Sequence, residues 1–309
     1  MPTGLILILT MSLWAGGFAS SATDTVAWQA ALDRAGYSAG IIDGQAGRKL
    51  VVAIRAFQSA RGLKVTGTQN DETAAALGIG KTPGTITYKI TTADVKMVQP
   101  PPLKWQDKAR CSRLGYRSLV DLLGERGHCT QALISRLNPR LNLNALKAGN
   151  QLVLPSVWSP RAPPRAAKLR VDLAAKTIQV LDNSSKVIGL FHCSIAKDKA
   201  KRPSGKARVV TVSKNPDYLF DPKMWPEVKD VKRKLVIPPG PRSPVGLCWI
   251  GLSLDGFGIH GTPEPELVGK TGSHGCFRLT NWDALRLGEM VRVVTPVRFT
   301  ESEAAVAAR

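Results

Sequence analysis

Two short stretches in the last third of the sequence gather its most reactive residue types. Gly258-Ile-His260-Gly-Thr262 is followed by Gly272-Ser-His274-Gly-Cys276-Phe-Arg278-Leu279. A cysteine is a useful nucleophile at neutral pH when a nearby base takes its proton or when its pKa is lowered. The spacing therefore predicts a thiol–imidazole site for acyl transfer, with Cys276 as the nucleophile and His260 as the base.

The two side chains are too far apart in sequence to meet on one helix or strand. We expect residues 258–262 to end one strand and Cys276 to begin the next element, with prolines and glycines bending the loop between them. The backbone N–H groups of Gly275 and Cys276 would then point at one substrate oxygen and form an oxyanion hole. The alternative is a buried structural cysteine beside two hydrogen-bonded histidines.

These stretches resemble the active-site motif of the L,D-transpeptidase (YkuD) family: His-Gly, a glycine-bearing loop, then Ser-His-Gly-Cys-x-Arg. Every letter of that motif is present. The resemblance implies that the Gly261 carbonyl orients His260, and that His274 contributes its backbone N–H rather than acting as a second base.

Two further residues of the motif are expected to bind substrate, Ser273 and Arg278. The guanidinium of Arg278 could hold a carboxylate of the substrate through two parallel hydrogen bonds. It could equally pair with Asp283 and serve the structure, and the sequence leaves both alternatives open.

The resemblance also implies the substrates and partners. The donor would be a peptidoglycan tetrapeptide stem, cut between diaminopimelate and the terminal D-alanine. The acyl group would pass to an amine of another stem, giving a 3→3 cross-link, or to a lysine of an envelope protein. Transfer to water would make the chain a carboxypeptidase or a cross-link hydrolase. A non-enzymatic wall-binding protein is an alternative from another class. A papain-like cysteine hydrolase is disfavoured, because its cysteine precedes its histidine in sequence, whereas His260 precedes Cys276 here.

Composition narrows the class of protein. The chain has 309 residues, of which 43% are hydrophobic, so two or three domains are expected. A net charge of +20 favours polyanionic partners, and cell-wall polymers and anionic membrane surfaces fit it equally well. We expect no nucleic acid as partner, because no binding signature accompanies the charge. We also expect no cofactor and no metal, because the histidines and cysteines lack the spacing of zinc ligands.

Residues 1–22 have the pattern of a signal peptide. Leu5–Trp14 is apolar and is followed by small residues, so cleavage is expected near Ala19–Ala22. The apolar run is too short to span a bilayer. The sequence therefore predicts export to the periplasm or cell envelope.

Residues 24–80 predict a unit of three helices. Asp24 is expected to cap a helix over Val26–Ala35, and Asn70 one over Glu72–Leu77. The unit resembles a peptidoglycan-binding domain of the three-helix type, which implies glycan as a further partner. It departs from that family at Leu50, where a threonine is usual.

Residues 85–157 predict a mixed α/β module. Leucines at helical spacing are followed by Asn138-Pro139 and by a strand that ends at Pro155. The module resembles the LysM type of wall-binding module, apart from a proline-rich insert. Residues 158–167 are rich in proline and arginine and are expected to be a linker.

Residues 168–300 alternate apolar and polar residues and predict a catalytic domain with a mostly β sandwich or barrel-like fold. The segment Asp283–Val291 is expected to be a helix. Lys223–Lys234 is a basic insertion that we interpret as a lid over the site.

Five cysteines leave one over after two pairs, and Cys276 is expected to be that one. An oxidising compartment would favour a bridge between Cys111 and Cys129. Cys193 and Cys248 are either bonded to each other or simply buried.

Overall fold

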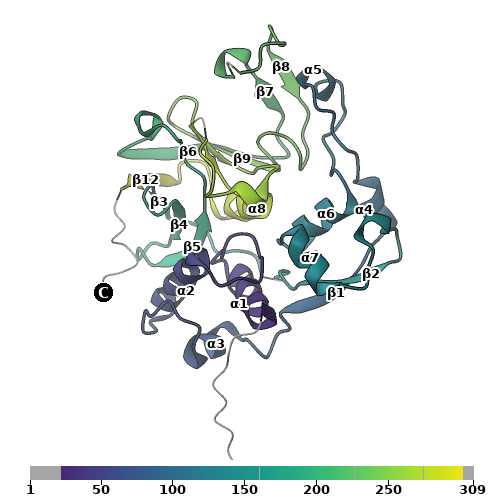
Figure 1. Cartoon of the computed structure of the whole chain (residues 1–309). Coiled ribbons are helices and arrows are strands. Elements are labelled where there is room, and N and C mark those ends of the chain that lie inside the picture. The colour runs from purple at the N-terminus through teal and green to yellow at the C-terminus, as the bar shows by residue number, and fades with distance from the viewer. Residues whose placement is uncertain (1–21, 160, 226, 274, 302–309) are drawn as a thin grey trace, which may run out of the picture.

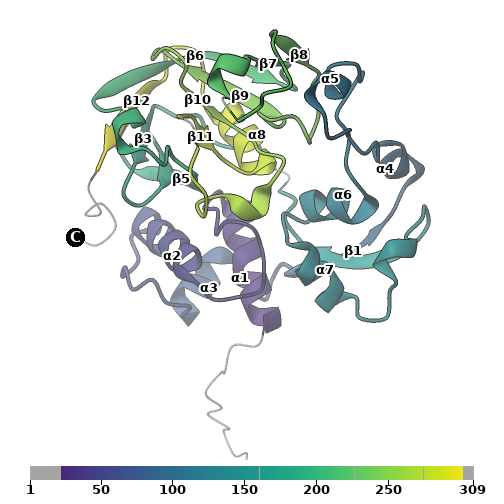
Figure 2. The same ribbon diagram turned by 45° about the horizontal axis from the view of Figure 1, so that its top comes forward.

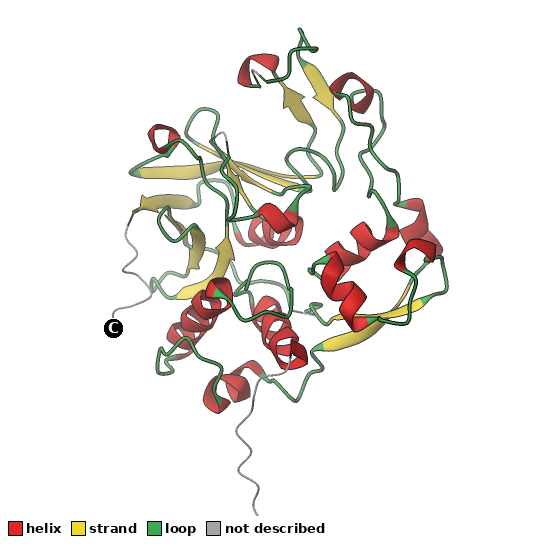
Figure 3. Ribbon diagram, in the orientation of Figure 1, coloured by secondary structure: helices red, strands yellow, loops and turns green. Residues whose placement is uncertain are grey.

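The computed structural model describes residues 22–159, 161–225, 227–273 and 275–301 (Figure 1). The predicted signal peptide up to residue 21 and His274 lie outside the described residues. Figure 3 shows a helical N-terminal part, a small mixed module beside it and a β-rich C-terminal part. Within the described ranges, no helix is both long and apolar enough to cross a membrane.

The N-terminal domain has three helices, α1 (Ala22–Ala35), α2 (Arg48–Arg61) and α3 (Asp71–Leu77). The Asn70 side chain caps α3 by accepting a hydrogen bond from the Thr73 N–H at 2.9 Å, in agreement with the prediction. The predicted cap at Asp24 is wrong, because α1 begins at Ala22 and Asp24 lies within its first turn. Leu50 is buried in the core of this domain, which gives this position an apolar packing role.

The middle module joins two antiparallel strands, β1 (Thr85–Lys89) and β2 (Gln151–Pro155). Between them the chain forms four α-helices, α4 (Thr92–Lys96), α5 (Trp105–Lys108), α6 (Leu119–Arg126) and α7 (Gln131–Leu137), and a short 3₁₀ helix, η1 (Leu143–Ala145). Leucines of α6 and α7 pack against the strands, and Val26 and Ala30 of α1 belong to the same core. The module is therefore packed on the N-terminal domain.

All five cysteines are free, so the expected bridge between Cys111 and Cys129 is absent. Cys129 is buried in the core of the middle module. Cys111 packs in a different cluster, around Phe220 of the catalytic domain. The two thiols therefore belong to separate cores. Cys193 and Cys248 are buried and also unpaired.

The catalytic domain contains one eight-stranded sheet in the order β11-β10-β9-β6-β12-β3-β4-β5. Its strands are β3 (Lys168–Asp172), β4 (Thr177–Leu181), β5 (Val187–His192), β6 (Lys206–Lys214), β9 (Cys248–Leu252), β10 (Gly258–His260), β11 (Phe277–Arg278) and β12 (Pro296–Thr300). A separate hairpin pairs β7 (Tyr218–Phe220) with β8 (Leu235–Ile237). The domain is thus mostly β, as predicted, and its strands form a single curled sheet where a sandwich or barrel-like fold was expected.

Strand β6 explains why the sheet is continuous. Its first residues, 206–208, pair with β12, and its later residues pair with β9. The register shifts between Val209 and Thr211, where the strand changes partner. Such a bulge bends a strand and lets it belong to both halves of a folded sheet.

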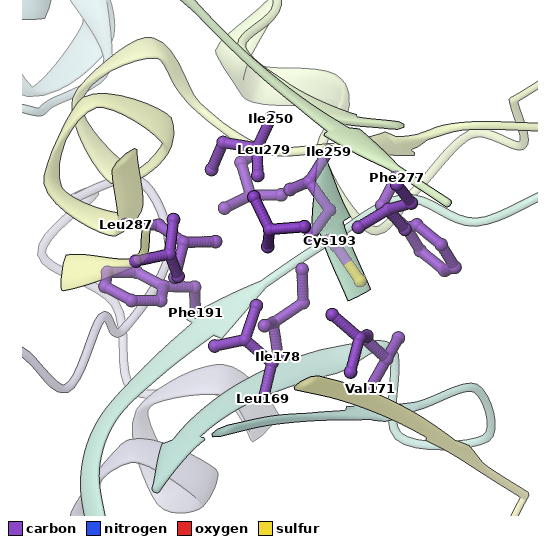
Figure 4. Packing of buried hydrophobic residues seen from close by; sticks show 14 of the residues in the cluster. Leu169, Val171, Ile178, Phe191, Cys193, Ile250, Ile259, Phe277, Leu279 and Leu287 are labelled. Atoms are coloured by element: carbon purple, nitrogen blue, oxygen red, sulfur yellow. The ribbon is translucent and has the colours of Figure 1, made fainter. Parts of the chain in front are cut away.

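The core of the catalytic domain lies between the curled sheet and helix α8 (Asn281–Met290), as Figure 4 shows from nearby. Phe191, Ile259, Phe277 and Leu287 are each at most 1% exposed. Helix α8 begins two residues before its expected start at Asp283, because the Thr280 side chain caps it. The packing fixes α8 behind the strands that carry the candidate site.

The N-terminal domain is docked on the catalytic domain (Figure 2). Ser38 of this domain donates its backbone N–H to the Leu190 carbonyl of β5, and it donates its hydroxyl to Asp283 at 2.9 Å. Burial raises the pKa of Asp283 to about 7. Lys49 of α2 donates to the Val268 carbonyl at 2.7 Å, within the loop that joins β10 to β11. The accessory domain therefore contacts the loop of the candidate site.

Candidate active site

His260 is the last residue of β10, and Cys276 immediately precedes the neighbouring strand β11. Strands β10 and β11 are parallel, with Ile259 opposite Phe277 and His260 opposite Arg278. Ile259 and Phe277 face the buried core. Because side chains alternate along a strand, His260 lies on the other face of the sheet, and we expect Cys276, one residue before β11, to face the same way. Regular parallel pairing separates their Cα atoms by roughly 8 Å. The topology thus brings together two residues far apart in sequence.

His260 is held in one tautomer. Its Nδ1 lies 2.6 Å from the Gly261 carbonyl oxygen. A carbonyl can only accept, so Nδ1 carries the proton and Nε2 keeps its lone pair. Burial lowers the pKa of His260 to about 4, and the charge of Arg278 adds to the effect. The ring is therefore a neutral imidazole with a free basic nitrogen at neutral pH.

Trp249 completes the surroundings of this ring, and the sequence analysis did not identify it. It lies opposite His260 on β9, and the two rings stack with centroids 5.6 Å apart. A Cβ at Gly258 would lie 2.4 Å from the indole. A glycine is therefore needed at position 258, so that the Trp249 side chain can lie across β10. The only signal in the sequence that could have pointed to it is an aromatic residue in the apolar stretch that precedes His260.

Cys276 lies directly before β11 and is only partly buried. Its Sγ donates to the Gly256 carbonyl at 3.4 Å. Burial raises the pKa of the Cys276 thiol, and the charge of Arg278 opposes that rise. The resting pair is thus a thiol and a neutral imidazole, an arrangement that needs general-base catalysis to make the nucleophile.

The other predicted residues lie around this pair. Ser273 donates its hydroxyl to the Cys276 carbonyl at 2.6 Å. Arg278 donates to the Thr271 hydroxyl at 3.3 Å and to the Gly272 carbonyl. In the described part of the chain no ion pair joins Arg278 to Asp283, whose carboxylate accepts from Ser38. Gly275 is partly exposed, and a Cβ there would lie 4.0 Å from the Phe257 ring, an ordinary van der Waals contact.

The segment that carries the base, residues 260–264, is named the base loop below. Asn281 of α8 packs behind it: the Asn281 Oδ1 accepts from the Leu247 N–H at 3.1 Å. A Cβ added at Gly261 would lie 2.3 Å from the same oxygen. The Asn281 amide nitrogen donates to the Pro241 carbonyl at 3.1 Å. This side chain therefore fixes the turn next to His260, a role that the sequence analysis did not identify.

Gly246 offers a test of that packing. Its φ is +61°, and a Cβ there would lie 2.0 Å from Asn281 Oδ1 and 2.7 Å from the Gly261 carbonyl carbon. We expect Gly246→Ala to lower the free energy of unfolding by about 2–4 kcal/mol, because strain and overpacking combine. Denaturant unfolding measures this. The control is Gly205→Ala, with φ +73° and no atom within 4 Å, which should cost only about 1 kcal/mol. Equal losses would contradict the packing argument.

The hairpin of β7 and β8, residues 218–237, is held by the middle module. Trp105 of α5 stacks on Phe220 with centroids 4.2 Å apart, and lies 5.7 Å from Trp225. The Trp225 indole donates to the Tyr218 hydroxyl at 2.8 Å. Burial raises the pKa of Tyr218, and the neighbouring Cys276 adds to that rise. The hairpin that contains the predicted lid thus reaches from α5 towards the thiol.

The geometry defines a class of protein: a cysteine–histidine pair on a curled sheet, with two accessory modules packed against it. Comparison with known sequences finds a matching profile for two of these parts. Residues 166–299 match the profile described as the L,D-transpeptidase catalytic domain, YkuD. Residues 21–77 match the profile described as a peptidoglycan binding domain. The chain therefore carries a catalytic domain of the L,D-transpeptidase type and an N-terminal peptidoglycan-binding domain.

Relatives in Bacillus bear names of the same kind. A Bacillus licheniformis protein, named as an L,D-transpeptidase YkuD, is 26% identical over 171 residues, which are 55% of this chain and 87% of the relative. A Bacillus subtilis protein, named as an L,D-transpeptidase YqjB, is 32% identical over 127 residues, covering 40% of this chain and 64% of the relative. An L,D-transpeptidase structure from Mycobacterium smegmatis overlays with a TM-score of 0.34 at 21% identity, over 43% of this chain and 57% of that one.

Proposed function

We propose that this chain is a cysteine-dependent L,D-transpeptidase that acts on peptidoglycan stem peptides through a thioester. The observation that carries the proposal is the hydrogen bond of 2.6 Å between His260 Nδ1 and the Gly261 carbonyl, beside a thiol on the same face of the sheet. It leaves Nε2 of a neutral imidazole as the base. The catalytic-domain match supports the same reaction class.

The reaction has two balanced halves. His260 Nε2 takes the proton of the Cys276 thiol while Sγ attacks the stem carbonyl. The tetrahedral intermediate expels D-alanine, whose amine receives that proton, and a thioester remains. An acceptor amine then attacks the thioester carbonyl, loses its proton to Nε2, and releases Cys276 as a thiol. Backbone N–H groups of Gly275 and Cys276 are assigned to the oxyanion in both halves.

The substrate class follows from the domains. A peptidoglycan-binding domain packed on the catalytic domain supports a wall polymer as substrate and a site of action in the cell envelope. We assign Arg278 and Ser273 to the binding of the stem, because both border the thiol and neither is tied to a carboxylate. The middle module, with its strand–helices–strand order, is proposed as a further wall-binding module of the LysM type.

The decisive experiment combines mass measurement with product analysis. A carbapenem incubated with the wild-type protein should add its full mass, because Sγ opens the lactam ring and the proton passes to the ring nitrogen. Purified tetrapeptide stems should then yield 3→3 dimers. Free tripeptide without dimers would assign a carboxypeptidase instead. Absence of both adduct and products would favour a non-enzymatic wall-binding protein.

The pKa of His260 sets an acid limit. Because that pKa is lowered to about 4, the imidazole remains able to take a proton in mildly acidic solution. We expect the rate of acylation to stay level from about pH 7 to about pH 5 and to fall below about pH 4. Stopped-flow or mass measurement of adduct formation across that range checks this. A fall centred near the ordinary histidine pKa of about 6.5 would contradict the buried, neutral ring.

The insertion Lys223–Lys234 is proposed as a lid that keeps water from the thioester. Its deletion should lower dimer formation and raise hydrolysis, because water then competes with the acceptor amine. The ratio of dimer to tripeptide measures the effect. Replacing Lys229 and Lys232 by alanine keeps the hairpin and serves as the control for charge. Unchanged turnover after the deletion would refute the lid.

A further inference from the structure

Helix α6 of the middle module reaches the base loop through two residues of the catalytic domain. Asp121 and Glu125 are four residues apart on α6 and therefore project from the same face of that helix. Asp121 contacts Arg242 and Glu125 contacts Asn281, both in the catalytic domain. Arg242 and Asn281 in turn contact the base loop. The module thus reaches the catalytic base through two short chains of hydrogen bonds.

The first chain runs through Asn281. Glu125 Oε2 accepts from the Asn281 amide nitrogen at 3.0 Å. The Asn281 Oδ1 accepts from the Leu247 N–H, and it packs so tightly against Gly261 that no Cβ fits there. Gly261 provides the carbonyl that fixes the His260 tautomer. Glu125 thereby limits how the Asn281 side chain, and with it the turn at Gly261, can move.

The second chain runs through Arg242. Its guanidinium side chain is 5% exposed and lies 3.2 Å from Asp121 and 3.0 Å from Glu264. The same guanidinium donates to the Pro263 carbonyl. A buried cation needs its counter-ions, and Asp121 is the more buried of the two carboxylates, at 14% against 44% exposed. Asp121 therefore helps to keep Arg242 in place on the far end of the base loop.

We infer that Asp121 and Glu125 are positioning residues of the active site, so that α6 of the middle module completes the support of His260. This inference rests on the proposed transpeptidase function. It assigns the module a part in the chemistry in addition to any part in wall binding. Each carboxylate also has a partner within the module: Glu125 accepts from the Tyr116 hydroxyl at 3.2 Å, and Asp121 accepts from the Arg117 N–H. Glu125 is the residue to change, because its partner Asn281 packs directly on Gly261.

The test uses the full chain with Glu125→Leu and Glu125→Gln. Leucine removes the acceptor of the Asn281 amide, so the maximal rate of carbapenem acylation should fall, by up to about 10²-fold for a base displaced by about 1 Å. The apparent affinity for the carbapenem should not change. Glutamine keeps an amide oxygen that can accept from Asn281, so Glu125→Gln should restore a rate close to that of the wild type.

A matched control separates positioning from stability of the module. Asp94 is a buried carboxylate of the same module and pairs with Arg126 of α6 at 3.2 Å. Its other side-chain partners in the described part of the chain, Tyr88 and Thr91, belong to the module as well. Asp94→Asn should lower the melting temperature and leave the acylation rate of the folded protein unchanged. An equal slowing in Asp94→Asn and Glu125→Leu, or a wild-type rate in Glu125→Leu, would overturn the inference.

A second readout does not depend on acylation. The chain has four histidines, so ¹⁵N-labelled imidazole signals can be assigned with a His260→Gln variant. The wild type should show His260 protonated at Nδ1, and Glu125→Leu should show a mixture of tautomers while Asp94→Asn does not. If the wild type forms no carbapenem adduct, the proposed function fails. If the tautomer is the same in Glu125→Leu and wild type, the positioning role fails.

Discussion

Cys276→Ala is expected to abolish the carbapenem adduct and to reduce stem cross-linking to the background of the assay. The substitution removes the only atom proposed to form a covalent bond with the donor, and loss of a nucleophile removes almost the whole rate, roughly 10⁶-fold in a well-studied hydrolase. Intact-protein mass spectrometry and chromatography of the stems measure the two effects.

The other thiols provide the control for this experiment. Burial raises the pKa of Cys129 and of Cys193 to about 12, so neither should react. Cys129→Ala should therefore keep the full adduct, although it should lose some stability. An adduct that persists in Cys276→Ala would move the nucleophile elsewhere and would reject the proposed mechanism.

His260→Gln is expected to lower the acylation rate near neutral pH by about 10²–10⁴-fold, the usual contribution of a general base. Glutamine can keep a side-chain hydrogen bond in this buried position but cannot take the proton of the thiol. The pKa of Cys276 is raised by burial, so very little thiolate is present to react without the base.

The pH dependence of that variant identifies the role of His260. As the pH approaches the raised pKa of Cys276, thiolate forms without help, and the rate of His260→Gln should climb towards that of the wild type. A loss that stays constant across the alkaline range would indicate that His260 serves the structure alone. A matching far-ultraviolet circular dichroism spectrum would show that the variant is folded.

Several features of the fold could be predicted because they depend on short stretches of sequence. Asn70 caps α3 since its side chain needs only the N–H of Thr73, three residues away. The alternation in 168–300 predicted strands, and β3 and β4 lie within that alternation. The predicted N-cap at Asp24 was wrong because the helix begins earlier, at Ala22, and the position of an N-cap depends on where the helix begins.

The pairing of sheet halves and of cysteines could not be predicted in this way. The curled sheet depends on the bulge between Val209 and Thr211, where β6 passes from β12 to β9. The bridge between Cys111 and Cys129 was expected from compartment and spacing, yet the proline-rich insert carries Cys111 to the cluster around Phe220. Both outcomes depend on packing between segments that are distant in sequence.

The sequence by itself determined which residues could do the chemistry, since a thiol, an imidazole and their glycines are properties of residue type and spacing. Only the tertiary structure decided how they are held. The parallel pairing of β10 with β11 places His260 opposite Arg278, two residues beyond Cys276. Asn281 of α8 packs against the base loop, and Arg242 donates to its Pro263 carbonyl. Glu125 and Asp121, which contact Asn281 and Arg242, belong to a different module. Contacts between such segments arise when the folded chain buries polar groups that must find partners, which no local pattern specifies.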